Sequence, residues 1–226
     1  MTDFAEENCR RFVSAHTALS SPPLVPEIAL HLASEVMVLW HETELRRTAQ
    51  AYALPDLPPP YWAFAWPGGS ALARYVLDNP AIVASKRVLD FGSGSGLVAI
   101  AAAKSGAACV TAAEIDPLSR AAIALNAAAN NVTIDLESRD IIGDVFSWDT
   151  ILAGDMCYER PLAERLVTWL RQAAGSGARV LIGDPGRNYF PPHGTERLAT
   201  YAVPTSRDLE DRDMRETSVY AVQPTR

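Results

Sequence analysis

The spacing of apolar positions divides the chain into an N-terminal helical stretch and a longer stretch in which helices and strands alternate. From residue 1 to about residue 54, apolar positions recur every three to four residues, which is typical of amphipathic helices. Three prolines between residues 22 and 26 interrupt this pattern, so we expect two helices, the second beginning near Pro26. The proline-rich residues 54–60 predict a stiff connector that leads into an aromatic turn at residues 61–69.

From residue 70 onwards, short apolar runs alternate with longer segments of helical periodicity. Helices are predicted at residues 70–77, 97–105, 117–130 and 161–174. Strands are predicted at residues 87–91, 108–113, 133–137, 150–154 and 179–183. Strands that alternate with helices predict βαβ units, and therefore a parallel, doubly wound sheet.

The C-terminal tail has a different pattern. Two further strands, at residues 198–203 and 218–222, are joined by a charged stretch at residues 207–216, which we expect to be a solvated surface. With no long helix between them, these strands predict an antiparallel pair at one edge of the sheet. The predicted fold class is α/β: a Rossmann-like, doubly wound, mostly parallel sheet with a C-terminal antiparallel hairpin and an N-terminal helical extension. We divide the chain into a cap and connector, residues 1–60, and a ligand-binding domain, residues 61–226.

The composition narrows the classes of function. The 226 residues carry 20 Lys and Arg against 27 Asp and Glu, a net charge of −7, which would repel a nucleic-acid backbone. Cys9, Cys109 and Cys157 are far apart, which argues against a disulfide framework or a zinc cluster and fits a reducing compartment. The N-terminus is acidic and no apolar run approaches about 18 residues. We therefore expect a cytoplasmic monomer with no metal, nucleic-acid or membrane partner.

The most specific motif is a glycine loop, Gly92-Ser93-Gly94-Ser95-Gly96, between a predicted strand and a predicted helix. Glycines at such a turn let backbone amides approach a ligand, and the helix N-terminus favours negative charge. A dinucleotide site would have the spacing GxGxxG, whereas this loop has GxGxG and is preceded by Asp90. A carboxylate at that place suits a cationic ligand better than a pyrophosphate. The loop therefore favours S-adenosylmethionine, which carries an ammonium and a sulfonium, and its predicted ligand residues are Asp90, Gly92, Ser93, Gly94 and Gly96.

Two further acids follow the next strands. Glu114 closes the second predicted strand, 22 residues after Gly92, where a carboxylate can accept hydrogen bonds from both ribose hydroxyls. Asp140 follows the third strand and would accept from an adenine amino group. The alternatives are an exposed glutamate at a strand end and an aspartate of a turn.

The segment from Asp90 to Gly96, Glu114, the five strands and the terminal hairpin together resemble the class I, seven-stranded, S-adenosylmethionine-dependent methyltransferases. The resemblance covers residues 60–226. It implies a seven-stranded sheet with S-adenosylmethionine as cofactor and S-adenosylhomocysteine as product. Its motifs identify the cofactor and not the methyl acceptor.

The acceptor is indicated by Asp155 and Tyr158, which follow the strand at residues 150–154. They resemble the DxxY motif of the lysine-directed group called methyltransferase family 16, and no Pro-Pro pair typical of base or glutamine methylation is present. Residues 23–28 and 60–69 resemble the family that methylates lysines of the electron-transfer flavoprotein β subunit, especially its bacterial members. The resemblance implies a protein-lysine N-methyltransferase with that subunit as substrate, and a ribosomal stalk protein as a second one. Cys157 departs from the pattern, because many members have phenylalanine there.

Lysine methylation requires a neutral amine. With a reference pKa near 10.4, freeing the amine at pH 7 costs about 4–5 kcal/mol. An aromatic pocket and a neighbouring sulfonium lower the pKa of the lysine, whereas the carboxylate of Asp155 raises it. We therefore assign Asp155 to capturing and orienting the ammonium, or to accepting its proton, and Tyr158 to supplying a wall and a hydroxyl.

Several alternatives remain open in the sequence. Trp62, Phe64 and Trp66 either pack the N-terminal segment onto the sheet or border the cofactor, and the resemblance favours a cofactor contact for Trp66. Arg187 belongs to a turn at residues 184–187 or contacts the substrate. A methyltransferase for small molecules or other proteins, and an NAD-binding or non-catalytic nucleotide-binding module, are the competing functions. The acidic surface suits a partner that presents lysines.

Overall fold

The computed structural model describes residues 2–35, 38–41, 50–54, 57–191 and 193–224. Its main sheet has seven strands in the order β5-β4-β3-β6-β7-β9-β8. These strands are β3 (Arg87–Phe91), β4 (Cys109–Ala113), β5 (Asp135–Glu137), β6 (Thr150–Gly154), β7 (Arg179–Asp184), β8 (Thr195–Pro204) and β9 (Met214–Val222). Strands β3 to β7 pair in parallel, whereas β9 is antiparallel to both β7 and β8. The predicted fold class and the C-terminal hairpin are confirmed.

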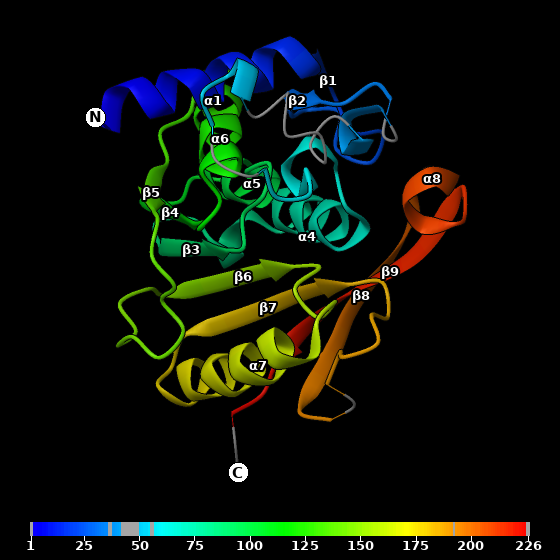
Figure 1. Ribbon diagram of the computed structural model, residues 1–226. Helices are drawn as coiled ribbons and strands as arrows, with labels where there is room; N and C mark the ends of the chain where they lie inside the picture. The colour runs from blue at the N-terminus through cyan, green and yellow to red at the C-terminus, as the bar shows by residue number, and fades with distance from the viewer. Residues whose placement is uncertain (1, 36–37, 42–49, 55–56, 192, 225–226) are drawn as a thin grey trace.

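Helices cover both faces of this sheet (Figure 1). One face carries α4 (Pro67–Asp78), α5 (Leu97–Lys104) and α6 (Pro117–Ala129), and the other carries α7 (Arg160–Gly175). Two short 3₁₀ helices, η1 (Tyr61–Ala63) and η2 (Pro80–Ile82), flank α4, and a four-residue helix, α8 (Arg207–Glu210), lies between β8 and β9. Because the central strands are covered on both sides, they read as continuous apolar runs, and their side chains divide into two buried clusters.

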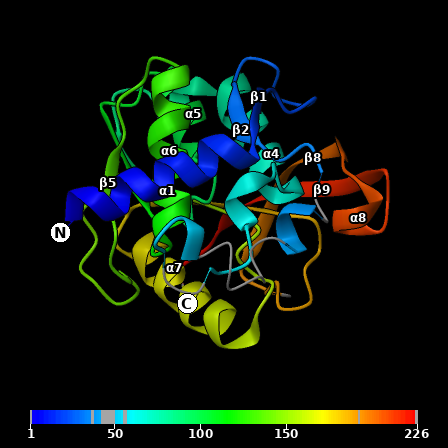
Figure 2. The ribbon, with the colours of Figure 1, turned by 45° about the horizontal axis from the view of Figure 1, so that its top comes forward.

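The N-terminal segment packs on α6 (Figure 2). It contains α1 (Thr2–His16) and the antiparallel pair β1 (Ala18–Ser20) and β2 (Leu30–Leu32). The prediction of a second helix from Pro26 is wrong for residues 26–35, which form a turn followed by β2. Apolar residues at 28, 30 and 32 also satisfy the period of two of a strand. The later part of that prediction is helical at residues 38–41, whereas residues 36–37 and 42–49 lie outside the described residues.

Helix α4 begins three residues earlier than predicted, so Pro67, Gly68 and Gly69 form its first turn instead of a loop. Proline is favoured at the first helical position, because its missing N–H would be unpaired there in any case. The glycines allow the helix to touch the sheet backbone directly. A Cβ atom on Gly68 would overlap the carbonyl oxygen of Gly183, and one on Gly154 would lie 2.7 Å from the Cα of Gly69. This close approach brings the N-terminus of α4 to the carboxyl ends of β6 and β7.

Candidate active site

The candidate site lies at the edge of the sheet where the parallel strands end. The register aligns Phe91 of β3 with Ala113 of β4 and Ala153 of β6, so the segments that follow these strands emerge at one level. Ligands of open α/β sheets bind in the crevice at this edge. The glycine loop, Glu114 and Asp155 all follow directly from these three strands.

The glycine loop needs its glycines for backbone conformation. Gly92, Gly94 and Gly96 have φ angles of +64°, +54° and +83°, in the left-handed region that side chains with a Cβ rarely adopt. A Cβ atom on Gly94 would have no neighbour within 4 Å, whereas one on Gly92 would overlap the sulfur of Met156. The loop is therefore open at Gly94 and covered by Met156 at Gly92.

Asp90 supports the loop from inside the protein. Its side chain is 1% exposed, and its Oδ2 accepts hydrogen bonds from the Ser93 hydroxyl at 2.5 Å and from the Ala99 amide at 3.0 Å. Burial raises the pKa of Asp90 to about 7, although both hydrogen bonds favour the ionised form. The carboxyl group thus ties the loop to the first turn of α5. Its direct contact with the cofactor stays a prediction.

Replacing Asp90 with asparagine is expected to change how stability depends on pH. The pKa of Asp90 is raised above its unfolded value of 3.8, so wild-type protein loses stability as the pH rises from about 4 to about 7. Asparagine does not titrate. When the pH rises from about 5 to about 8, the free energy of unfolding of wild-type protein should therefore fall by about 2–3 kcal/mol relative to that of Asp90→Asn. Urea denaturation at both pH values measures this shift.

The control for this experiment is Asp149→Asn, at the opposite edge of the sheet. Asp149 is paired with Arg87, which holds the pKa of Asp149 below its usual range. The titration of Asp149 therefore lies below its usual value of 3.8, outside the range measured, so Asp149→Asn should show the wild-type pH dependence between about pH 5 and pH 8. A pH dependence of Asp90→Asn equal to that of wild type would contradict the prediction.

Glu114 lies against the same loop, and its contact with ribose hydroxyls stays a prediction. Its Oε2 accepts the Gly94 amide at 3.0 Å and its Oε1 accepts the Asp116 amide at 3.0 Å, while burial raises its pKa. Asn126 of α6, which the sequence did not single out, also holds the loop, because its Nδ2 donates to the Ser95 carbonyl at 2.8 Å. An asparagine among the apolar positions of a predicted helix was the available signal for this bond.

Asp140 stands apart from these residues. Its Oδ2 pairs with Arg165 of α7 at 2.7 Å, and its Oδ1 accepts the Ile142 amide at 3.0 Å. Its side chain is half exposed, and none of its described contacts joins it to the glycine loop or to Glu114. The structure gives Asp140 the bonds of a turn aspartate, and a contact with adenine stays a prediction.

Asp155 is held firmly at the end of β6. It is 8% exposed and has a φ angle of +58°, which is unusual for a residue with a side chain. Its Oδ2 accepts the Gly69 amide at 2.9 Å, and its Oδ1 accepts Nε and Nη2 of Arg187 at 3.1 and 2.7 Å. Burial raises the pKa of Asp155, and the Arg187 guanidinium opposes that effect. A predicted lysine-binding carboxylate is thus already paired with an arginine.

Aromatic side chains lie beside this pair. The ring of Tyr61 is 5.8 Å from that of Tyr158 and 5.9 Å from that of Trp66, between centroids. The guanidinium carbon of Arg187 lies 5.7 Å from the centre of the Trp66 ring. Tyr158 is 46% exposed, and its pKa is raised by burial first and then by Tyr61 and two nearby glutamates, one of them Glu114. The structure thus places Trp66 beside Arg187, the partner of Asp155, and links Trp66 to Tyr158 through Tyr61, while the roles of these residues stay predictions.

Of the two alternatives for Trp62, packing of the N-terminal segment or a border to the cofactor, the structure supports packing. This side chain has no exposed surface and belongs to the cluster that joins α1 to α6. Trp66 is half-buried, and its indole N–H donates to the Tyr61 carbonyl at 2.8 Å. A cofactor contact of Trp66 stays a prediction.

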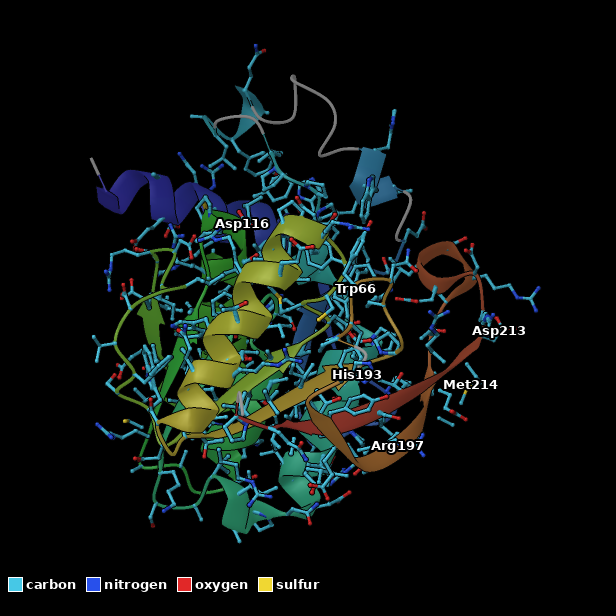
Figure 3. The ribbon with its side chains drawn as sticks, turned by 90° about the horizontal axis from the view of Figure 1, so that it is seen from below. Trp66, Asp116, His193, Arg197, Asp213 and Met214 are labelled. Atoms are coloured by element: carbon cyan, nitrogen blue, oxygen red, sulfur yellow. The ribbon has the colours of Figure 1, made fainter. Side chains whose placement is uncertain are left out.

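Glu210 is a site residue that the sequence did not reveal. The charged stretch at residues 207–216 was expected to be solvated, but Glu210 is 7% exposed, and its Oε1 pairs with Nη2 of Arg187 at 2.5 Å. Arg215 of β9 lies 3.7 Å from its Oε2. Figure 3 shows Asp213 and Met214 at the tip of the same hairpin. The expectation is wrong for Glu210, because the helical turn of α8 directs this carboxylate back to the sheet.

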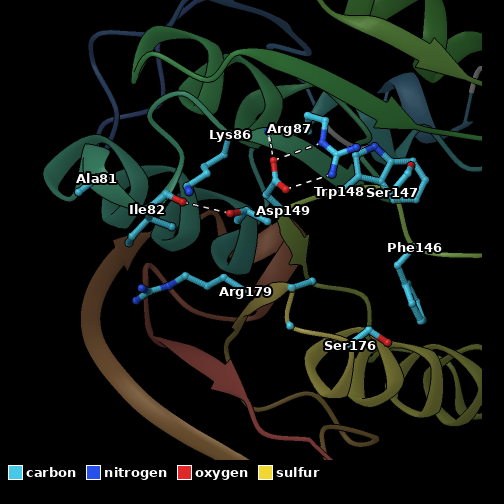
Figure 4. Close-up of a pocket in the computed structure, with 13 residues that line it drawn as sticks. Ala81, Ile82, Lys86, Arg87, Phe146, Ser147, Trp148, Asp149, Ser176 and Arg179 are labelled. Atoms are coloured by element: carbon cyan, nitrogen blue, oxygen red, sulfur yellow. Dashed lines mark hydrogen bonds and ion pairs between the residues drawn. The ribbon is translucent and has the colours of Figure 1, made fainter.

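A cavity of about 460 Å³ lies away from this site (Figure 4). Its lining includes Arg87, Thr150 and Arg179, the first residues of β3, β6 and β7, so it lies at the amino ends of the strands. Among the described residues, no cluster of three or more His, Cys, Asp or Glu side chains has the arrangement of a metal site. No helix within the described ranges is both long and apolar enough to cross a bilayer.

The seven-stranded sheet with an antiparallel β9, the glycine loop after β3 and the acid after β4 define the fold of the class I methyltransferases. Solved structures that share this fold include the following two. Magnesium protoporphyrin IX methyltransferase from Synechocystis, with bound S-adenosylmethionine, has a TM-score of 0.51 and 15% identity, over 69% of this chain and 78% of that chain. A Thermoplasma acidophilum protein has a TM-score of 0.51 and 18% identity, over 69% of this chain and 89% of that one.

The family follows from more similar sequences. The electron transfer flavoprotein β subunit lysine methyltransferase of Xenopus laevis is 40% identical over 95% of this chain and 87% of its own length. The human enzyme of that name is 37% identical over 98% and 84%. A family model described as ribosomal protein L11 methyltransferase matches residues 71–154. The chain belongs to the family of electron transfer flavoprotein β subunit lysine methyltransferases.

Proposed function

We propose that this protein transfers methyl groups from S-adenosylmethionine to lysine side chains of the β subunit of electron-transfer flavoprotein. The observation that carries the proposal is membership of the family over 95% of the chain. The site supports it with a glycine loop for the cofactor and an Asp155–Tyr158 pair at the same sheet edge.

The residues around the glycine loop fit the cofactor. The loop is open at Gly94, and the Glu114 carboxylate beside it has the acceptor oxygens that ribose hydroxyls require. Glu114 adds negative charge beside the loop, where a cationic ligand would be held. When bound, S-adenosylmethionine supplies an electrophilic methyl group on a sulfonium sulfur.

The chain's own residues position and desolvate the lysine. Tyr61, Trp66 and Tyr158 would exclude water from the incoming side chain, which disfavours the charged ammonium. Asp155 would accept a hydrogen bond from the amine, and the Tyr158 hydroxyl would orient it. Such positioning removes most of the entropic cost of bringing two reactants into line.

Isotopic labelling tests the proposal. Purified protein with tritiated S-adenosylmethionine should label the isolated β subunit of electron-transfer flavoprotein, and mass spectrometry should assign the added methyl groups to lysines. Label that appears only in RNA or in small molecules would overturn the proposal. Calorimetric titration should detect binding of S-adenosylhomocysteine and none of NAD, which separates a methyltransferase from a dinucleotide-binding module.

A ribosomal protein is the second candidate substrate, because the matching family model describes methyltransferases of ribosomal protein L11. The stalk protein and L11 are therefore assayed beside the flavoprotein subunit. The proposal also includes a monomer that acts in the cytoplasm, and gel filtration of the purified protein tests the monomer.

A further inference from the structure

Arg187 lies between two buried carboxylates. Its Nε and Nη2 donate to Asp155 Oδ1 at 3.1 and 2.7 Å, and its Nη1 and Nη2 donate to Glu210 at 3.3 and 2.5 Å. The Arg187 side chain is itself mostly buried, with its guanidinium near the ring of Trp66. One cation thus connects the end of β6, the segment after β7 and the hairpin that carries α8.

This arrangement bears on the protonation state of the substrate. An isolated ionised carboxylate stabilises an ammonium and raises its pKa, whereas methyl transfer needs the neutral amine. An ionised carboxylate has about four acceptor sites. Asp155 uses three of them, two on Oδ1 for Arg187 and one on Oδ2 for Gly69, so one site on Oδ2 remains for an amine, while pairing with arginine balances much of the charge.

We propose that Arg187 is a positioning residue for methyl transfer, which fixes the Asp155 carboxylate and balances its charge, so that Asp155 accepts a hydrogen bond from a neutral lysine amine instead of holding an ammonium. This inference rests on the proposed function. It also assigns a purpose to Glu210, which holds the other side of the guanidinium and so keeps Arg187 directed toward Asp155.

The charges around Asp155 make the effect of Arg187 large. The segment after β7 contributes Arg187, β7 itself ends in the buried Asp184, α8 contributes Glu210 and β9 contributes Arg215. The neighbouring Cys157 and Tyr158 are neutral near pH 8, because burial raises the pKa of both. The α4 N-terminus contributes only the backbone amide of Gly69. Without Arg187, three acids would face a single cation, Arg215.

The test compares the pH dependence of kcat in variants of this network. Arg187→Gln combined with Glu210→Gln removes the cation together with one of its two anions, which limits the loss of stability. We expect the pH of half-maximal kcat to rise by about one unit or more, since an unbalanced charge within bonding distance shifts a pKa by about 1–3 units. At pH 7.5, kcat should fall about tenfold or more, while KM for the protein substrate changes less.

Arg187→Lys is the second variant. Lysine keeps the charge but has no planar fork for two carboxylates, so the pH midpoint should stay near that of wild type while kcat falls at every pH. Arg87→Gln is the matched control, because it breaks another Arg–Asp pair at the opposite edge of the sheet. It should change neither the pH of half-maximal kcat nor kcat itself.

The outcomes separate the two proposals. Absence of lysine methylation by wild-type protein would contradict the proposed function. Wild-type methylation together with an unchanged pH midpoint in the double variant would overturn only the role of Arg187, leaving it as a structural tie. A raised pH of half-maximal kcat in Arg187→Lys would also overturn the role of Arg187. This variant tests the proposal even if the double variant does not fold.

Discussion

Asp155→Asn is expected to lower kcat for lysine methylation by about 10²-fold or more, the effect typical of losing one preorganised hydrogen-bonding group at the reacting centre. Asparagine keeps the size of the side chain but loses its charge. The NH₂ end of the asparagine side chain donates hydrogen bonds. The side chain therefore cannot accept hydrogen bonds from both the Gly69 amide and the Arg187 guanidinium, as Asp155 does. The amine would then meet an acceptor that is weaker and misdirected. Initial rates at saturating cofactor and protein substrate measure the effect.

Two measurements keep this experiment specific to catalysis. Binding of S-adenosylhomocysteine to Asp155→Asn should stay within about threefold of wild type, because Asp90, Gly94 and Glu114 remain in place. Asp149→Asn is the matched control, since it changes an aspartate that also pairs with an arginine but lies at the far edge of the sheet. Asp155→Asn with near wild-type kcat would remove Asp155 from the mechanism.

Local patterns were enough to predict the sheet and to place the glycine loop and Glu114 at one edge of it. Each parallel strand is a short apolar run between breakers, and the residues that follow such strands meet at one edge. Glu114 therefore lies against the loop at Gly94, although 20 positions separate them in the sequence. These contacts follow from topology, and the alternation of helices and strands already determines that topology.

The part of the site around Asp155, which would bind the methyl acceptor, depends on contacts that no local pattern encodes. Arg187 and Glu210 are 23 residues apart in the sequence. The charged residues around Glu210 predict an exposed segment, but α8 directs this one side chain inward. Likewise, the alternation at residues 28–32 became a strand because Asn126 and Asn130 bond the backbone of residues 29 and 31. Tertiary partners decide such cases, so the sequence identified Asp155, Tyr158 and Arg187 as candidates but not the pairing of Arg187 with Asp155.

Gly94→Ala is expected to weaken binding of S-adenosylhomocysteine by about tenfold or more. Gly94 has a φ angle of +54°, and a non-glycine residue in that region costs about 1–2 kcal/mol, which favours a loop rearranged away from its binding conformation. The added methyl group would also project from the open side of the loop. Gly106→Ala is a closely matched control, because Gly106 has a φ angle of +84°, likewise has no neighbour within 4 Å of an added Cβ, and lies just past the far end of α5. Both variants should lose similar stability in thermal unfolding, so a weaker Kd in Gly94→Ala alone assigns the open loop to the cofactor. Equal Kd values for the two variants would show that the loop does not contact it.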